Sequence, residues 1–208
     1  MHPYATDCPS RKLVPLILAL LSIGCTWGLH HIFKRWQITL PWWVDAPSLT
    51  GFYGIGHHVF DTYVWRWPVW KRLGVVRLCD INGDWTGIVR SSHDGFGEPR
   101  KVQLKALQTW TCISIVLRAE ESRSHSLTAS LLVMHDHTEP VIVYTYSNEP
   151  LSKAAGTMHT HRGNCEISII DDRMEGYYFS GRDRSNHGDI ELKRHGTKKK
   201  LKNAKTHQ

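Results

Sequence analysis

The sequence predicts an all-β domain, an antiparallel barrel of about eight strands, preceded by an N-terminal region of two transmembrane helices. Residues 13–33 carry no formal charge and are rich in bulky apolar side chains. After Asp80 the chain changes to short segments in which apolar and polar residues alternate, separated by turns rich in Gly, Asn and Asp. Alternation with a period of two is typical of strands with one buried face.

The first element is a membrane span. Leu13–Phe33 is 21 residues long, and as a helix it extends for roughly 30 Å, the thickness of a bilayer core. Basic pairs flank it on both sides, Arg11-Lys12 and Lys34-Arg35. An alternative is a cleaved signal peptide, because Ser22-Ile23-Gly24-Cys25 resembles a lipoprotein cleavage site, although Ser22 stands where such sites usually have Leu.

The second element, Ser48–Trp67, has apolar residues at helical spacings and ends before Pro68. Trp36, Trp42 and Trp43 precede it, as aromatic residues do at a membrane surface. Polar residues interrupt it at His57, His58 and Asp61. His57 and Asp61 are four residues apart and can pair on one helix face, which makes them functional candidates if they are buried in a bundle. The alternative is an amphipathic helix that lies in the interface with this face in water.

The flanking charges favour one orientation of such a two-helix hairpin. One end carries Arg11, Lys12, Arg66, Lys71, Arg72 and Arg77, and the other carries Lys34 and Arg35. Because basic residues concentrate on the cytoplasmic side, both ends of the chain are expected there.

Eight segments of the remaining chain have strand character. They lie at 85–89, 102–106, 113–117, 127–133, 141–147, 165–169, 176–181 and 189–192. Turn residues separate them at 94–97, 148–150, 171–172 and 185–188. Leu151–Gly156 forms a short helix or an ordered loop. Eight antiparallel strands with one apolar face each close most economically into a barrel, which holds side chains or one small ligand. A β-sandwich is the rival architecture.

The net charge and the cysteines exclude few classes of function and no cellular compartment. The net charge of +7 is equalled by seven basic residues after Glu191, namely Lys193, Arg194, Lys198, Lys199, Lys200, Lys202 and Lys205. The basic composition predicts a disordered, solvated C-terminal tail, and binding of this tail to anionic lipid or nucleic acid is the secondary alternative. The five cysteines have neither metal-ligand nor redox spacing. Nothing demands an oxidising compartment.

The sequence contains no nucleophile-elbow motif of hydrolases, no P-loop for nucleoside triphosphates, no zinc-protease motif and no dinucleotide-binding fingerprint. Two His-x-His pairs, His135/His137 and His159/His161, are the candidates for a metal site, because residues two apart on a strand point the same way. The alternative to a metal site is that the first pair consists of solvated turn residues and the second pair lines the lumen of the barrel. We expect no metal, no cofactor and no catalytic residues.

Arginines near strand ends suggest an anionic ligand. Arg162, Arg182 and Arg184 lie beside aromatic residues, and arginine both pairs with phosphate and stacks on bases. The aromatic candidates for stacking are Trp85, Trp110, Tyr144, Tyr146, Tyr177 and Tyr178. Local ion pairs and core packing are the alternative roles of these residues.

Several ordered motifs carry a resemblance to a known family. They are Trp42–Ser48 with Gly51–Gly54, Asn82–Gly87 with Ser91-Ser92, Gln108–Thr111, Met158–Gly163 and Gly176–Arg182. Together they resemble the two-transmembrane, β-strand-rich effectors of bacterial cyclic-oligonucleotide antiphage signalling, also called minimal STING-like effectors. The likeness covers about residues 40–194.

That resemblance implies a cytosolic barrel, tethered to the inner membrane, that binds a cyclic dinucleotide made by a cognate nucleotidyltransferase. Ligand binding in the family leads to homo-oligomerisation, disruption of the membrane lipid and death of the infected cell; no nucleic acid partner is expected. On this basis the ligand-binding candidates are Trp85, Ser91, Thr109, Trp110, Tyr146, Arg162, Tyr178, Arg182 and Arg184.

The expected parts are a cytoplasmic segment 1–11, a transmembrane region 12–77 with spans at about 13–33 and 49–67, a cytosolic barrel 78–194 and the tail 195–208. Two other functions stay open. A lipocalin-like carrier of a small apolar or lipid ligand predicts a lumen without charged lining, and a metal-dependent enzyme predicts bound metal at the four histidines.

Overall fold

The computed structural model describes residues 1–38, 42–133, 139–152, 154, 156, 158–181 and 184–195. The chain forms two compact units. One holds residues 1–81 with 107–114 and 128–141, and the other holds 82–106, 115–127 and the chain from 142 onward.

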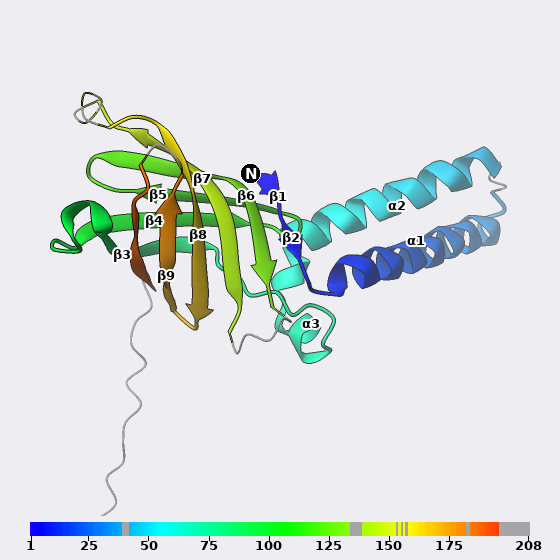
Figure 1. Cartoon of the computed structure of the whole chain (residues 1–208). Helices are drawn as coiled ribbons and strands as arrows, with labels where there is room; N and C mark the ends of the chain where they lie inside the picture. The colour runs from blue at the N-terminus through cyan, green and yellow to red at the C-terminus, as the bar shows by residue number, and fades with distance from the viewer. Residues whose placement is uncertain are drawn as a thin grey trace, which may run out of the picture. The chain divides into compact units, whose positions relative to one another are not determined.

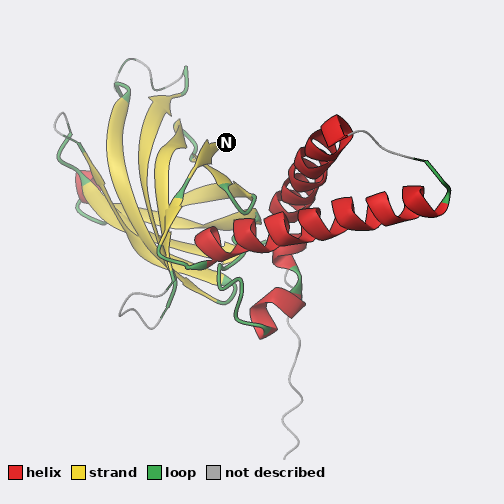
Figure 2. Ribbon diagram, turned by 90° about the vertical axis from the view of Figure 1, so that its right-hand side faces the viewer, coloured by secondary structure: helices red, strands yellow, loops and turns green. Residues whose placement is uncertain are grey.

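Eight antiparallel strands close into a barrel, as the sequence predicts (Figures 1 and 2). They are β3 (Gly83–Ser91), β4 (Arg100–Gln108), β5 (Cys112–Arg118), β6 (Ser122–Leu132), β7 (Val141–Pro150), β8 (His161–Ile170), β9 (Arg173–Ser180) and β10 (His187–Arg194). The neighbours run β5-β4-β3-β10-β9-β8-β7-β6, and β6 pairs again with β5. Closure satisfies the backbone groups that an open sheet leaves at its edges. The rival sandwich is therefore not adopted.

Tight turns lie where the sequence predicts them. Gly95 and Phe96, in the β3–β4 connection, have φ of 64° and 63°, and Asp171, in the β8–β9 turn, has φ of 52°. Asp tolerates this left-handed region better than most residues, which explains the Asp171-Asp172 turn. Residues 151, 152, 154 and 156 adopt no helix among the described positions of that segment.

Two short strands at the N-terminus were not expected from the sequence. β1 (His2–Pro3) pairs with β5 through His2 and Ile113, and β2 (Ala5–Thr6) runs parallel to β6 through Ala5 and Ser130. Each strand has two residues, too few for alternation to show. Segment 1–11 thus contributes two short strands to the sheet before α1 begins at Ser10.

Two long helices follow, α1 (Ser10–Arg35) and α2 (Trp42–Thr62), which run in opposite directions as a hairpin (Figure 1) and diverge from each other in Figure 2. The second helix ends at Thr62, earlier than the expected end at Trp67. A 3₁₀ turn, η1 (Val64–Arg66), and a short helix, α3 (Pro68–Arg72), complete the segment. Pro68 occupies the first turn of α3, where its missing N–H is tolerated. Among the described helices, α1 meets the length and apolarity criteria for a span, with a mean hydropathy of 1.8.

Asp61 does not pair with His57. Its carboxylate Oδ1 accepts hydrogen bonds from the backbone N–H and the hydroxyl of Thr111, both at 2.7 Å. Its own backbone carbonyl accepts the N–H of Trp110 at 3.0 Å. The polar interruption of α2 therefore fastens the end of that helix to the β4–β5 turn.

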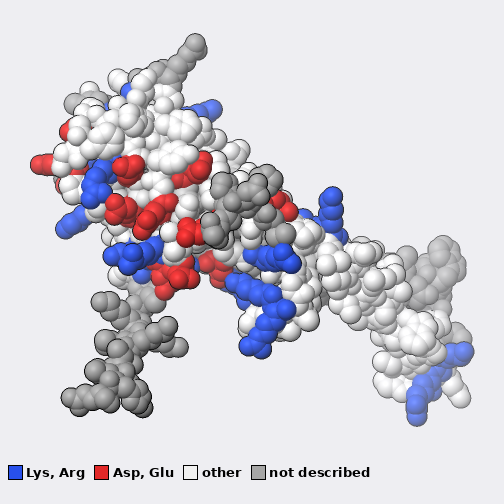
Figure 3. All heavy atoms as spheres, turned by 60° about the horizontal axis from the view of Figure 1, so that its bottom comes forward, with Lys and Arg blue, Asp and Glu red and all other residues white. Residues whose placement is uncertain are grey.

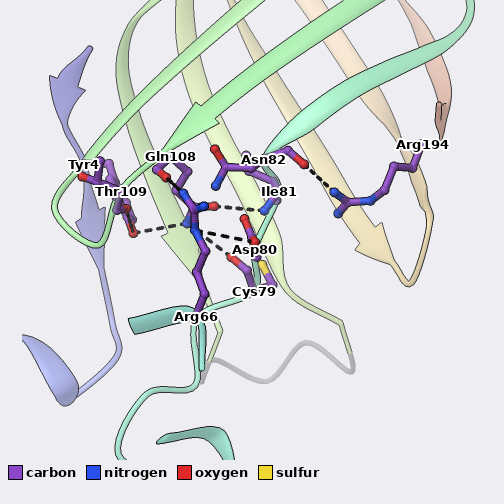
Figure 4. A network of polar contacts seen from close by, with 9 residues as sticks. All are labelled: Tyr4, Arg66, Cys79, Asp80, Ile81, Asn82, Gln108, Thr109 and Arg194. Atoms are coloured by element: carbon purple, nitrogen blue, oxygen red, sulfur yellow. Dashed lines mark hydrogen bonds and ion pairs between the residues drawn. The ribbon is translucent and has the colours of Figure 1, made fainter. Parts of the chain in front are cut away.

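Gln108, the last residue of β4, is the centre of a buried polar network (Figure 4). Its side-chain N–H₂ donates to the hydroxyl of Tyr4 and to the carbonyl of Cys79, and its Oε1 accepts from the N–H of Ile81 at 3.0 Å. The guanidinium of Arg66 donates to its backbone carbonyl at 2.7 Å. Gln108, 1% exposed, thus joins the N-terminal segment and the linker into β3 through its side chain, and the segment after α2 through its backbone carbonyl.

Candidate functional site

A cavity of about 370 Å³ occupies one end of the barrel. Its walls come from the last residues of β3, β5, β7 and β9 and the first residues of β4, β6, β8 and β10, so it lies where the barrel opens at the β3–β4, β5–β6, β7–β8 and β9–β10 connections. Deeper in the barrel, the inward positions are filled by large side chains, including Trp85, Leu104, Ile167, Met174 and Leu192. The site is therefore a cup that is closed at its base.

Three tyrosines form one side of the cup. Tyr144 and Tyr146 belong to β7, with ring centroids 6.4 Å apart, and Tyr178 belongs to β9. Glycines on the neighbouring strands make room for two of these rings. A Cβ at Gly163 would lie 2.4 Å from the Tyr146 hydroxyl, and a Cβ at Gly188 would lie 2.7 Å from the Tyr178 ring. The two rings thus lie over bare backbone on the barrel wall.

The polar groups on this wall are neutral. Burial raises the pKa of Tyr146 to about 12, against a hydrogen bond with Ser180 that lowers it. Burial also raises the pKa of Cys165 to about 12 and that of Tyr144 well above its usual value, and these two side chains are hydrogen-bonded to each other. The wall therefore offers ring faces and dipoles at neutral pH, and no negative charge.

Positive charge gathers at the mouth. Arg100 begins β4, and its guanidinium forms an ion pair with Asp94 at 3.2 Å. Arg184, in the β9–β10 connection, has no ion-pair partner among the described residues. His161 also lines the mouth, with Nδ1 3.0 Å from the carbonyl oxygen of His159. Glu121 is the acid on the described lining. Arg184 is thus the cation best placed to accept an anionic ligand.

The structure brings four of the nine ligand-binding candidates to this cavity: Ser91, Tyr146, Tyr178 and Arg184. Ser91 is 6% exposed, and its Oγ accepts the N–H of His93 at 3.2 Å. Their role in ligand binding stays a prediction, but their convergence from β3, β7, β9 and the β9–β10 connection makes them neighbours in space.

The other candidates lie elsewhere or outside the described residues. Trp85 is fully buried beneath the guanidinium of Arg194, and Trp110 packs edge-on against Phe60. A ring covered in this way has no free face for a base, so we leave both out of the proposed site. Thr109 uses its hydroxyl to accept the N–H of Cys112 in the β4–β5 turn. Arg162 is exposed and out of phase with the inward-facing Gly163 and Cys165. Arg182 lies outside the described residues.

Sequence reasoning missed Arg100 and Asn148 as lining residues. Tyr144, an aromatic stacking candidate, does line the cavity, whereas Tyr177 is exposed and is not on the described lining. Arg100 had a detectable signal, because it shares the phase of Val102 and Leu104 and so stands on the inward face of its strand. An arginine at such a position faces the lumen, where it needs a partner or a ligand.

No group of three or more metal-ligating side chains occurs among the described residues. His159 is exposed and is not part of the cavity wall that contains His161. His135 and His137 lie outside the described residues.

Comparison with known proteins places the whole chain in context. A family model described as "Cap15, cyclic dinucleotide receptor domain" matches residues 76–194, and a second, "Cap15, TM helices", matches residues 12–66. Two similar curated proteins are both named CD-NTase-associated protein 15. The protein from Staphylococcus schleiferi is 26% identical over 185 residues, which cover 87% of this chain and 90% of the relative. The protein from Yersinia aleksiciae is 29% identical over 210 residues, which cover 93% and 97%.

Proposed function

The chain belongs to the Cap15 family, and we propose that its barrel is a non-enzymatic receptor that binds a cyclic dinucleotide in the cup. The observation that carries this proposal is the pairing of a cationic mouth with an aromatic wall in one cavity. A cyclic dinucleotide has two phosphates and two bases, so it needs both kinds of contact.

The chemical roles follow from the position of each side chain. Arg184 is the phosphate partner, and Arg100, at the start of β4, is a second cation for the phosphates when Asp94 shares or releases it. Tyr146 and Tyr178 offer ring faces to the bases. Ser91 and Asn148 are polar, nearly buried groups on the lining that suit the reading of base edges.

The lining argues against the carrier of an apolar or lipid ligand. Such a ligand is best held by an uncharged lumen, whereas Arg100, Arg184 and Glu121 all contribute to this wall. Burying an apolar ligand against these groups costs their hydration without replacing it.

The membrane part of the proposal rests on α1 and on the family's transmembrane model. We propose that α1 and α2 both cross the bacterial inner membrane, with the barrel in the cytoplasm. A cognate nucleotidyltransferase supplies the ligand. Ligand binding then drives homo-oligomerisation, which raises the local concentration of the hairpins until they disrupt the membrane and kill the infected cell.

The full-length protein in detergent, titrated calorimetrically with a panel of cyclic di- and trinucleotides, tests the receptor. We expect submicromolar binding of one cyclic dinucleotide, weaker binding at higher salt, and little binding of the matching linear dinucleotide. If no member of the panel binds a protein that is shown to be folded, the receptor proposal is wrong.

A further inference from the structure

An apolar groove of about 170 Å³ runs between the two long helices and the segment that follows them. Its residues are Val14, Ile17, Leu18 and Leu21 of α1, Gly56, Val59 and Phe60 of α2, and Val64 and Trp70 after α2. Every lining residue is apolar, so the groove offers nothing to water or to a polar ligand.

The position of the groove along α1 matches one leaflet of a bilayer. Arg11 and Lys12 open the helix, and the groove begins at Val14 and continues to Leu21. At 1.5 Å per residue these seven steps extend for about 10 Å, within the roughly 15 Å of one leaflet's hydrocarbon. The groove therefore lies at acyl-chain depth just inside the basic end of the helix.

Two cations follow a lining residue of the groove directly in the chain. Trp70 lines the groove, and Lys71 and Arg72 follow it directly in the last turn of α3. Both are exposed, and among the described residues neither forms an ion pair. Trp67, Val69 and Leu73 beside them are 55%, 45% and 65% exposed. A basic, tryptophan-rich segment with exposed apolar side chains is typical of the membrane–water interface.

We propose that this groove and Lys71 with Arg72 form a binding site for one anionic phospholipid. An acyl chain lies in the groove, and the headgroup phosphate pairs with the two cations. The inference rests on the membrane helices of the family, and not on the cyclic dinucleotide. A second copy of the hairpin, packed in parallel into the groove, is the less suitable occupant because it brings its own cations to the same depth.

Charge on the rest of the hairpin fits this assignment. In the space-filling view the helical part of the molecule shows Lys and Arg only toward its ends, with uncharged surface between them (Figure 3). Lys34 and Arg35, in the last turn of α1, mark the end away from the groove. They provide a matched control with the same number of charges.

The test uses native mass spectrometry of the delipidated full-length chain, titrated with phosphatidylglycerol and with phosphatidylcholine of the same acyl chains. We expect one phosphatidylglycerol to bind in preference to phosphatidylcholine. Lys71→Glu with Arg72→Glu should lower the affinity for phosphatidylglycerol by about tenfold or more, because both cations that attract the anionic headgroup are replaced by acids. Lys34→Glu with Arg35→Glu should leave it unchanged.

Val59→Phe, which adds bulk inside the groove, should reduce the binding of both lipids. Circular dichroism and thermal unfolding of the same samples report whether each variant is folded, and both are expected to stay unchanged. Equal affinity for the two lipids, or full phosphatidylglycerol occupancy in the Lys71/Arg72 variant, would overturn the proposal. So would a Val59→Phe protein that keeps its lipid but loses self-association, since the groove would then belong to a second copy.

Discussion

Arg184 and Arg100 share the mouth of the cup but differ in their partners. Arg100 is held by Asp94, whereas Arg184 has no ion-pair partner among the described side chains. A charge-assisted bond to phosphate is worth about 1.5–3 kcal/mol, so Arg184→Gln should weaken cyclic dinucleotide binding by about ten- to a hundredfold. Calorimetry on the full-length protein measures this change.

Arg173 is the matched control for that substitution. It begins β9 at the closed end of the barrel, is exposed, and is not on the cavity lining. Arg173→Gln removes the same charge and should leave affinity unchanged. Equal losses in both variants would point to general electrostatic attraction, and no loss in either would remove Arg184 from the site.

Cys165 gives a pH dependence of known sign. Burial raises the pKa of its thiol from 9.0, the value for an exposed cysteine, to about 12 in the folded protein. The folded state therefore keeps the proton while the unfolded state releases it, and stability present below pH 9 is lost as pH rises toward 12. Between pH 8.5 and 10.5 this loss amounts to about 2 kcal/mol.

Cys165→Ser isolates that contribution, since serine does not titrate and can still hydrogen-bond to Tyr144. Denaturant unfolding of the full-length protein in detergent, under reducing conditions, measures the free energy of unfolding at each pH. We expect the decrease above pH 9 to be smaller in the variant by about 2 kcal/mol. The tyrosines titrate in both proteins, so parallel pH profiles would contradict the expectation.

Residue type and strand phase differ in what they predict about the site. Tyr146, Tyr178 and Arg184 were chosen by type and do line the cavity, but Trp85 and Trp110 were chosen the same way and are covered by Arg194 and Phe60. Aromatic rings fill cores as readily as they line pockets. Strand phase separates Arg162 from Arg100, because only Arg100 has the same phase as the inward-facing residues of its strand.

At the scale of elements, Gln108 links three segments that are far apart in sequence. Gln108→Leu leaves the buried N–H of Ile81 and the carbonyl of Cys79 without this partner. Removing a hydrogen-bond partner from a buried backbone group costs about 1–3 kcal/mol. We expect a loss of stability in this range and faster amide hydrogen exchange in β2 and in residues 79–81, followed by mass spectrometry.

Gln103→Leu is the control, because it is the same substitution on the same strand at a position that is exposed. It should leave exchange in those segments unchanged. If Gln108→Leu also leaves them unchanged, the network does not hold the N-terminal strands to the barrel.

Long strands were predictable and the shortest ones were not. The eight barrel strands have eight or more residues each, apart from β5 with seven, so alternation shows in every one. β1 and β2 depend on partners more than 100 residues away, Ile113 and Ser130. No local pattern specifies such pairing. The contact of Asp61 with Thr111 is equally non-local, which is why a pairing with His57 looked reasonable.

At the scale of the whole molecule, β1 and β2 restrict how the hairpin can meet a membrane. They precede α1 and pair with β5 and β6, while the chain after α2 leads into β3 of the same closed sheet. A single sheet cannot lie on both sides of a bilayer. If α1 crosses, α2 must return, although its composition alone does not mark it as a span.

This constraint predicts a definite topology. A reporter phosphatase inserted after Gln37 should be active, because that position lies at the far end of the hairpin, and fluorescent proteins fused to either terminus should fold in the cytoplasm. The larger set of basic residues, at the ends of the hairpin that join the sheet, favours the same arrangement. An inactive phosphatase at Gln37 with both termini cytoplasmic would mean that the hairpin lies in the membrane surface, as the amphipathic alternative for α2 requires. If the hairpin lies in the membrane surface, replacing Lys34 and Arg35 by neutral residues should leave the reporters unchanged. If the hairpin crosses the membrane, the same replacement should increase phosphatase activity, because fewer cations need to be translocated.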